Sequence, residues 1–263
     1  MNAWYTHESL GHGLWAIDEK GMDRMYLING ISHALMIDTG WGLADVKKYI
    51  RTITQLPLIV VNTHGHPDHV SGNYLFDKVY IAKEDIMNQS FARDIREMKS
   101  RTAIRELPDW FNREEWCAKT FTTPVIMKDG DLFDLGDTII EVLSAPGHTA
   151  GSVALIDRTR RVLFAGDSVL VGEIWMHGAA AMPLTVYRDS LVRLRECADR
   201  FDYVLAGHTD KKYDCSTIMR LIECINQILK GTRSGEPYHT FAGDGLACDF
   251  GDVRIVYRHD RLE

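Results

Sequence analysis

Four side chains of metal-ligand type lie within the short segment from His64 to His69. The imidazoles of His64 and His66 alternate along the chain and can face one ion. Pro67 is typical of the first turn of a helix, from which Asp68 and His69 would project toward a second ion. Imidazoles and carboxylates without thiolates suit borderline-hard divalent ions. The segment therefore predicts a metal centre, with zinc as the first expectation and manganese or iron as alternatives.

Three more side chains of ligand type each follow an apolar run, with a glycine directly before them. His148 follows EVLSAPG, Asp167 follows VLFAG and His208 follows YVLAG. Glycine permits a tight exit from a strand, and functional side chains gather where strands end. Seven ligands are too many for one tetrahedral ion and suit a pair that shares a carboxylate. We therefore expect two divalent metal ions, with Asp167 as the bridge.

Apolar patterning predicts the elements that would hold these side chains. A buried strand, LIVVNT, runs directly into the histidine segment, and Asn29-Gly30 indicates a hairpin between MYLI and HALMI. Strands are also expected in TIIEVLSA, SVALI and VLFAG, and a last hairpin over about 246–258. Helical spacing favours helices over 43–53, 186–201 and 217–230, the last one ending at Gly231.

No linker or internal repeat divides the chain, so the sequence predicts a single domain over residues 1–263. The segment of about 82–121 carries an apolar stripe at helical spacing and a cluster of aromatic residues. It is expected to be a helical insertion. Its residues Trp110 and Trp116 would either cover a pocket or pack on the core.

Composition narrows the partners and the location. The 263 residues include 30 Lys and Arg against 37 Asp and Glu, which gives a formal charge of −7. This negative charge disfavours binding to the phosphate backbone of nucleic acid. No apolar run approaches a membrane span, and the first residues show neither a basic nor an apolar leader region. The five cysteines are scattered, which favours reduced thiols. We expect a cytoplasmic protein that acts on a small-molecule substrate, with its oligomeric state left open.

The motifs THGHPDHVSGN, APGHTAGS, FAGDS and AGHTD, in this order and spacing, resemble those of the metallo-β-lactamase superfamily of metallohydrolases. The match covers about residues 25–230. The resemblance implies an α/β (α+β) fold, a four-layer αβ/βα sandwich. It also implies the ligand sets: His64, His66 and His148 on the first metal, Asp68, His69 and His208 on the second, and Asp167 bridging. Asp38 matches a buried acid beneath the site that orients ligands, or else it initiates a turn before Gly40.

Differences from particular branches of the superfamily reduce the number of groups that the sequence resembles. Zinc β-lactamases lack a bridging aspartate at the position of Asp167, and flavodiiron oxygen reductases carry glutamate where His66 stands. The tRNA-processing and nuclease branches have more basic surfaces. The remaining group resembles hydroxyacylglutathione hydrolases and acyl-homoserine lactonases, although we recognise no basic glutathione-binding tail like that of the former in this sequence.

Two adjacent cations would share a water and lower its pKa toward about 7, which gives a hydroxide nucleophile without a serine or cysteine. The sequence accordingly has no GxSxG nucleophile motif. One metal would polarise the substrate carbonyl, the other would stabilise the leaving group, and Asp68 would orient the hydroxide and carry its proton away. The expected function is a dinuclear hydrolase of a small ester, lactone or thioester.

The loop after Asp167 supplies the expected substrate contacts, and Tyr187 matches a tyrosine that stabilises the oxyanion in lactonase-like members. The alternative for Tyr187 is a helix-start aromatic packed on the core. The loop candidates are Glu173, Ile174, Trp175, Met176 and His177.

Three other functions stay open on the same motifs. One is a phosphodiester or sulfate-ester hydrolase, and another is a mono-iron protein that oxidises sulfur or consumes oxygen. The third, a non-catalytic binding domain, is disfavoured because it would not need seven intact ligands.

Overall fold

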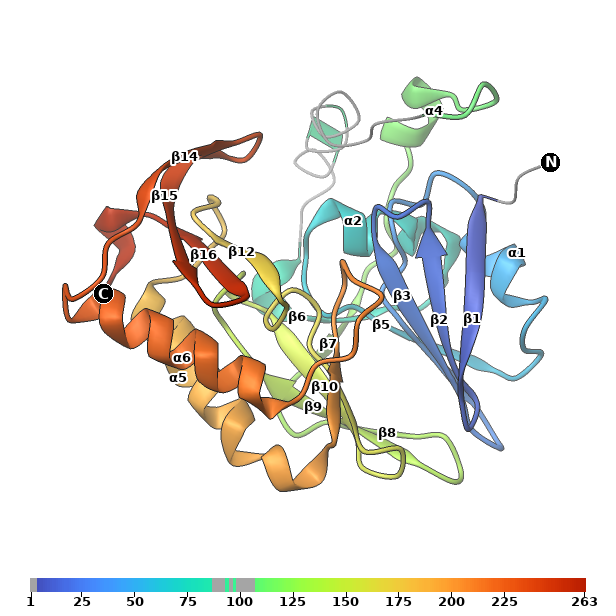
Figure 1. Cartoon of the computed structure of the whole chain (residues 1–263). Helices are drawn as coiled ribbons and strands as arrows, with labels where there is room; N and C mark the ends of the chain where they lie inside the picture. Colours follow the sequence, from blue (N-terminus) through green and yellow to red (C-terminus); the bar gives the residue numbers. More distant parts are fainter. Residues whose placement is uncertain (1–3, 87–92, 95–96, 98–106) are drawn as a thin grey trace. The chain divides into compact units, whose positions relative to one another are not determined.

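The computed structural model describes residues 4–86, 93–94, 97 and 107–263 (Figure 1). The chain forms two compact units. Unit 1 comprises Met1–Met127 and Asp134–Thr138, and unit 2 comprises Lys128–Phe133 and Ile139–Glu263. The assignment of the whole chain to one domain stays a prediction.

Unit 1 is built on one seven-stranded sheet in the order β1-β2-β3-β4-β5-β6-β7. The first four strands pair antiparallel, and the strands from β4 to β7 pair parallel. The hairpin predicted around Asn29-Gly30 is the β3–β4 pair. The strands are β1 (Tyr5–Gly11), β2 (Leu14–Glu19), β3 (Arg24–Asn29), β4 (Ala34–Ile37), β5 (Leu58–Val61), β6 (Tyr80–Ala82) and β7 (Val125–Met127).

Short helices accompany this sheet. The helix α1 (Val46–Ile50) begins at the N-cap Asp45 and buries Val46 and Ile50 in the core of unit 1. It is shorter than the helix predicted over 43–53. The histidine segment contains α2 (Pro67–Val70), followed by the 3-10 turn η1 (Ser71–Leu75).

Much of the predicted helical insertion lies outside the described residues. Its described part includes the 3-10 turn η2 (Lys83–Asp85) and the helix α4 (Arg113–Cys117). Trp116 is buried and its indole donates to the carbonyl of Trp41 at 3.0 Å, whereas Trp110 is 61% exposed. Trp116 therefore packs on unit 1, as one of the two alternatives expected.

Unit 2 contains two sheets, in the orders β13-β11-β10-β9-β8 and β12-β16-β15-β14. Figure 1 shows the helices α5 (Leu184–Glu196) and α6 (Cys215–Leu229) side by side, and their apolar faces join the core of unit 2. The 3-10 turns η3 (Ala198–Arg200) and η4 (His259–Arg261) complete the unit. The strands are β8 (Leu132–Asp134), β9 (Ile139–Ser144), β10 (Val153–Asp157), β11 (Val162–Phe164), β12 (Gly172–Met176), β13 (Tyr203–Leu205), β14 (Glu236–Thr240), β15 (Gly243–Phe250) and β16 (Val253–Tyr257).

A segment expected as a loop is a strand in the structure. Residues 172–176, expected as a loop, form β12 and pair parallel with β16. This pairing joins segments about 80 residues apart, and no local pattern reveals it. As strand residues, Ile174 and Met176 point into the core of unit 2, and Trp175 lies on the opposite face.

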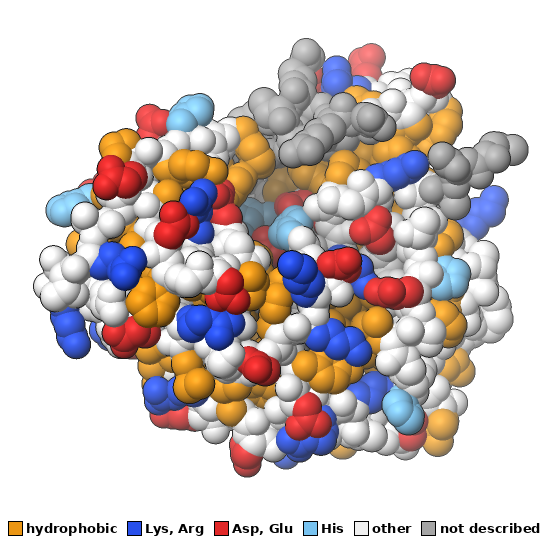
Figure 2. Space-filling model, viewed as in Figure 1, with side chains coloured by type: hydrophobic (Ala, Val, Ile, Leu, Met, Phe, Trp, Pro, Cys, Tyr) orange, Lys and Arg blue, Asp and Glu red, His pale blue; other side chains and the backbone are white. Residues whose placement is uncertain are grey.

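Three general features bear on the predicted location and partners: the surface charge, the length and hydropathy of the helices, and the state of the thiols. Figure 2 shows Lys and Arg side chains interspersed with Asp and Glu side chains over the described residues of one face. No helix among the described residues is both long and apolar enough to cross a membrane. All five cysteines are free thiols. The cytoplasmic location and the exclusion of nucleic acid stay predictions.

Candidate metal centre

The parallel pairing of β4 with β5 explains why Asp38 lies beside the histidine segment. Asp38 directly follows β4 and His64 follows β5, and parallel neighbours end at the same edge of a sheet. The amide of Asp38 donates to the carbonyl of Val61 at 2.8 Å, and the amide of Thr39 donates to the carbonyl of His69 at 2.9 Å. The backbone of unit 1 therefore brings the predicted buried acid to the predicted ligands.

The carboxylate of Asp38 organises two of those ligands. It accepts hydrogen bonds from the Thr63 amide at 2.7 Å, the Thr63 hydroxyl at 2.8 Å and His69 Nδ1 at 2.8 Å. The Thr63 hydroxyl in turn lies 3.1 Å from His64 Nδ1. Since Nδ1 of both histidines is engaged on this side, the Nε2 lone pairs of His64 and His69 are the ones available to a metal.

The four ligand-type side chains of unit 1 lie close together. His64 Nε2 is 3.1 Å from His66 Nδ1, near the separation of about 3.3 Å expected for two nitrogen ligands of one tetrahedral zinc. The rings of His64 and His69 have centroids 4.0 Å apart, and Asp68 Oδ2 lies 3.9 Å from His69 Nε2. The segment thus forms a compact donor set, with Pro67 in the first turn of α2 as expected.

The three predicted ligands of unit 2 also converge. Asp167 follows β11 and His208 follows β13, and these strands are parallel neighbours. His148 follows β9, which runs in the same direction as β11 because β10 is antiparallel to both. Asp167 Oδ2 lies 3.1 Å from His208 Nε2 and 3.5 Å from His148 Nε2. The carboxylate therefore stands between two imidazoles.

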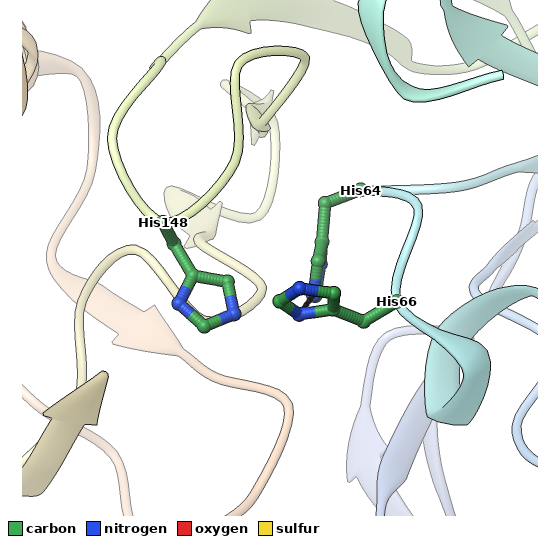
Figure 3. Close-up of side chains that lie close together, drawn as sticks. All are labelled: His64, His66 and His148. Carbon is green, nitrogen blue, oxygen red and sulfur yellow. Dashed lines mark hydrogen bonds between the residues drawn. The ribbon is translucent and has the colours of Figure 1, made fainter. Parts of the chain in front are cut away.

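His148 is oriented by a backbone group. Its Nδ1 donates to the carbonyl of Trp175 on β12 at 2.9 Å, which leaves Nε2 facing Asp167. Figure 3 shows three of the predicted ligands: His64 and His66 come from the loop between β5 and α2, and His148 comes from the loop between β9 and β10. The donors of each unit are thus oxygen and imidazole nitrogen, which fits divalent ions such as zinc.

The predicted substrate contacts fall into different surroundings. Met176 belongs to the core of unit 2, and its buried side chain argues against a substrate contact. His177 is buried, with Nε2 2.7 Å from Thr240 Oγ1. Trp175 is partly exposed, and its indole donates to the Glu173 carboxylate.

The packing of Tyr187 is that expected from the alternative interpretation, in which it is an aromatic residue at a helix start that packs on the core. Its side chain is 0% exposed and belongs to the core of unit 2, and its hydroxyl donates to the carbonyl of Ser168 at 2.7 Å. Burial raises the pKa of Tyr187 well above its usual value of 10. A role at the oxyanion stays a prediction, and this geometry favours the packing role.

Sequence reasoning missed three groups that hold the ligands. Thr63 connects His64 to Asp38, and its position directly before His64 was the available signal. The carbonyl of Trp175 orients His148, and Asp85 accepts the amide of Gly65 at 2.8 Å within the ligand segment. Neither of the latter contacts has a signature in the sequence, since both join distant parts of the chain.

Comparison with known proteins identifies the family. The model of the metallo-beta-lactamase superfamily matches residues 21–208. The chain belongs to this superfamily, which confirms the resemblance and the α/β sandwich fold. The solved metallo-beta-lactamase from Pontibacter korlensis aligns with a TM-score of 0.62 and 18% identity, over 83% of this chain and 97% of that one.

Two relatives whose names state an activity are more similar to this chain in sequence. The acyl-coenzyme A thioesterase MBLAC2 of Homo sapiens is 29% identical over 229 residues, which cover 78% of this chain and 81% of that protein. Hydroxyacylglutathione hydrolase GloC of Haemophilus influenzae is 28% identical over 153 residues, 54% of this chain and 64% of that protein. With the His and Asp donor sets described above, these findings make the chain a metal-dependent hydrolase.

Proposed function

We propose that this protein is a thioesterase that binds two divalent metal ions, zinc in the first place, and hydrolyses an acyl thioester. The observation that carries the proposal is the position of Asp167, whose Oδ2 lies within 3.5 Å of Nε2 of both His148 and His208. The superfamily resemblance assigns these two histidines to different ions. A carboxylate between them therefore supports the shared ligand of a metal pair.

The proposed ligand sets follow the resemblance residue by residue. Asp167 would bridge the two ions. The donors within each unit are imidazole nitrogens and carboxylate oxygens, as described above. The first ion would be held by His64, His66 and His148, and the second by Asp68, His69 and His208.

When bound, the two ions would lower the pKa of coordinated water toward about 7 and polarise the thioester carbonyl. The chain itself supplies orientation and proton transfer. Asp38, through Thr63 and directly, holds His64 and His69 in one tautomer and ring orientation. Asp68 is partly exposed at the start of α2, where its carboxylate can accept the proton that the attacking water loses.

The two named relatives favour thioesters within the wider group of esters and lactones. An acyl-coenzyme A and an acylglutathione both join an acyl group to a thiol through a thioester. Hydrolysis of either substrate therefore cleaves a thioester bond, and the two reactions differ in the thiol that is released. This shared bond is the substrate class that we propose here.

The direct test measures metal content and thioester hydrolysis on the same preparation. The purified chain is reconstituted with zinc, manganese or iron, analysed for metal per chain, and assayed for thiol release from acetyl- and octanoyl-coenzyme A and from S-lactoylglutathione. A lactone, a phosphodiester and a β-lactam serve as comparison substrates. We expect two zinc ions per chain and turnover of thioesters well above that of the other substrates.

Two variants test whether metal content and activity depend on the proposed bridging carboxylate. Asp167→Asn should lose metal and activity, whereas His259→Ala, an exposed histidine of η4 outside the donor sets, should keep both. Preferred turnover of the phosphodiester, or a single iron per chain in the active preparation, would contradict the proposal.

A further inference from the structure

The tip of the β14–β15 hairpin lies against the end of β12. Thr240, the last residue of β14, places its Oγ1 2.7 Å from Nε2 of the buried His177. Gly245 on β15 permits the close approach, because a Cβ there would lie 3.0 Å from both the Cβ of His177 and the Cγ1 of Val256. The hairpin tip is therefore fixed beside β12 by packing and by a polar contact.

This placement brings two aromatic side chains together. Phe241, at the tip between β14 and β15, contacts Trp175 of β12 edge to face, with ring centroids 4.9 Å apart. Trp175 makes a second edge contact with His177 at 5.4 Å. Phe241 nevertheless keeps 48% of its surface exposed, and Trp175 is also partly exposed. The pair, called here the Trp175–Phe241 pair, is a partly exposed apolar surface held by contacts of the hairpin tip with β12.

The pair is connected directly to a proposed metal ligand. The carbonyl of Trp175 accepts the hydrogen bond of His148 Nδ1 at 2.9 Å, within unit 2. The reacting carbonyl of a thioester must lie beside the metal, and the acyl chain and the thiol part both start from that point. One of these two parts can therefore reach the Trp175–Phe241 pair.

The chemical character of this surface decides between the two parts. The indole of Trp175 donates to the carboxylate of Glu173, and Asp244 on β15 pairs with His239 at 2.7 Å on the hairpin. Arg254, which faces Glu173 across the sheet, also pairs with Asp249 at 2.6 Å. The Glu173 carboxylate against the pair is itself paired with Arg254, which Asp249 also engages, so these charges neutralise one another. What the pair offers a ligand is aromatic ring surface, which suits a hydrocarbon chain better than the phosphates of coenzyme A or the carboxylates of glutathione.

We propose that the Trp175–Phe241 pair binds the apolar acyl chain of the substrate, so that the hairpin tip determines acyl-chain specificity. This inference rests on the proposed thioesterase function. The matched superfamily model ends at residue 208, before the hairpin, so the family resemblance assigns Phe241 no role.

The test compares Phe241→Ala with the wild-type chain on acetyl, butyryl and octanoyl thioesters. Each acyl group is offered both on coenzyme A and on N-acetylcysteamine, a thiol without phosphates. We expect kcat/KM for the octanoyl substrates to fall about 10-fold, the loss of apolar contact with about two methylene groups. The acetyl substrates should change less than about 2-fold, and the octanoyl loss should be equal on both thiols.

Controls separate specificity from damage to the fold. Phe241→Leu keeps an apolar side chain and should retain most of the preference for octanoyl substrates. Leu132→Ala removes another exposed apolar side chain of unit 2, on β8, and should leave the preference unchanged. Calorimetric titration with octanoate gives a readout without turnover, and Phe241→Ala should weaken binding by a similar factor.

The outcomes are distinct. An equal loss for acetyl and octanoyl substrates, or a loss on coenzyme A thioesters alone, overturns the acyl-chain role while thioesterase activity stands. A wild-type chain that hydrolyses no thioester in the assay overturns the proposed function and this inference together.

Discussion

Nδ1 of His69 lies 2.8 Å from Oδ2 of Asp38, and both side chains are buried in unit 1. Asp38 adopts a positive φ of 62°, a conformation that is unfavourable for most residues and is tolerated by aspartate. Its carboxylate accepts two further hydrogen bonds from Thr63. A strained residue held by three donors next to a ligand is suited to orient that ligand before a metal binds.

Asp38→Asn should weaken metal binding by about 10- to 100-fold, the usual cost of losing a partner of a metal-binding histidine. The amide group would place a donor opposite His69 Nδ1 or Thr63, where the carboxylate now accepts. Competition with a chelator of known affinity measures the change. Asp45→Asn, the same substitution at an exposed N-cap, is the matched control. Equal affinity in the two variants would remove Asp38 from the metal centre.

The sequence predicted the elements that carry strong local signals. The β3–β4 hairpin follows from Asn29-Gly30. The helix α6 follows from its apolar period and from Gly231, which adopts a φ of 69° directly after the C-cap. The structure places the N-cap at Asp214 and begins the helix at Cys215. The sequence also placed the ligand candidates directly after strands, and Asp167 and His208 lie close together because parallel neighbours end at the same edge of a sheet. The division of the candidates between two ions stays a prediction.

Contacts between distant segments could not be predicted in this way. The pairing of β12 with β16 turned a predicted loop into a strand and buried Met176, and the carbonyl of Trp175 became the partner of His148. A backbone carbonyl has no side-chain signature. Phe241 likewise lies 66 residues from Trp175 in the sequence, and only the hairpin brings the two rings together.

Asp167→Ala should lose the proposed metal pair, because removing the bridge leaves two cations with less negative charge between them. We expect metal content to fall from two ions per chain to one or fewer, and thioester turnover to fall by orders of magnitude. Elemental analysis after gel filtration in metal-free buffer measures the first quantity. Asp199→Ala, an acid in the 3-10 turn η3, controls for the loss of a carboxylate in unit 2. Near-normal metal content in Asp167→Ala would exclude the bridging role.

Tyr187→Phe should lower the free energy of unfolding by about 1 kcal/mol and leave kcat within about 2-fold. The reason is that the variant loses a buried hydrogen bond to the carbonyl of Ser168, whereas the ring keeps its packing. Urea unfolding and steady-state kinetics measure the two effects. Tyr203→Phe on β13 is the matched control for removal of a hydroxyl. A fall in kcat of about 10-fold or more, with stability unchanged, would instead support the oxyanion role.

Glu19 gives unit 1 a dependence of stability on pH. Its carboxyl group is 0% exposed, and burial raises its pKa from 4.5 to about 7, although hydrogen bonds from the Trp4 indole and the Trp41 amide act in the opposite direction. The folded chain therefore holds a proton at Glu19 that the unfolded chain releases above about pH 4.5. Stability from this group is fully present below that pH and is lost as pH rises toward about 7.

Glu19→Gln should remove this dependence, because an amide cannot ionise and still offers an acceptor to Trp4 or Trp41. Between pH 5 and pH 8 the wild-type chain should lose stability relative to the variant, by on the order of 3 kcal/mol for a shift of this size. Urea unfolding across that range, with the metal-free chain to avoid changes in metal binding, measures the difference. Glu196→Gln at the exposed end of α5 should run parallel to the wild type. Parallel curves for Glu19→Gln and the wild type would mean that Glu19 is ionised in the folded chain throughout, with its charge stabilised by the donors around it.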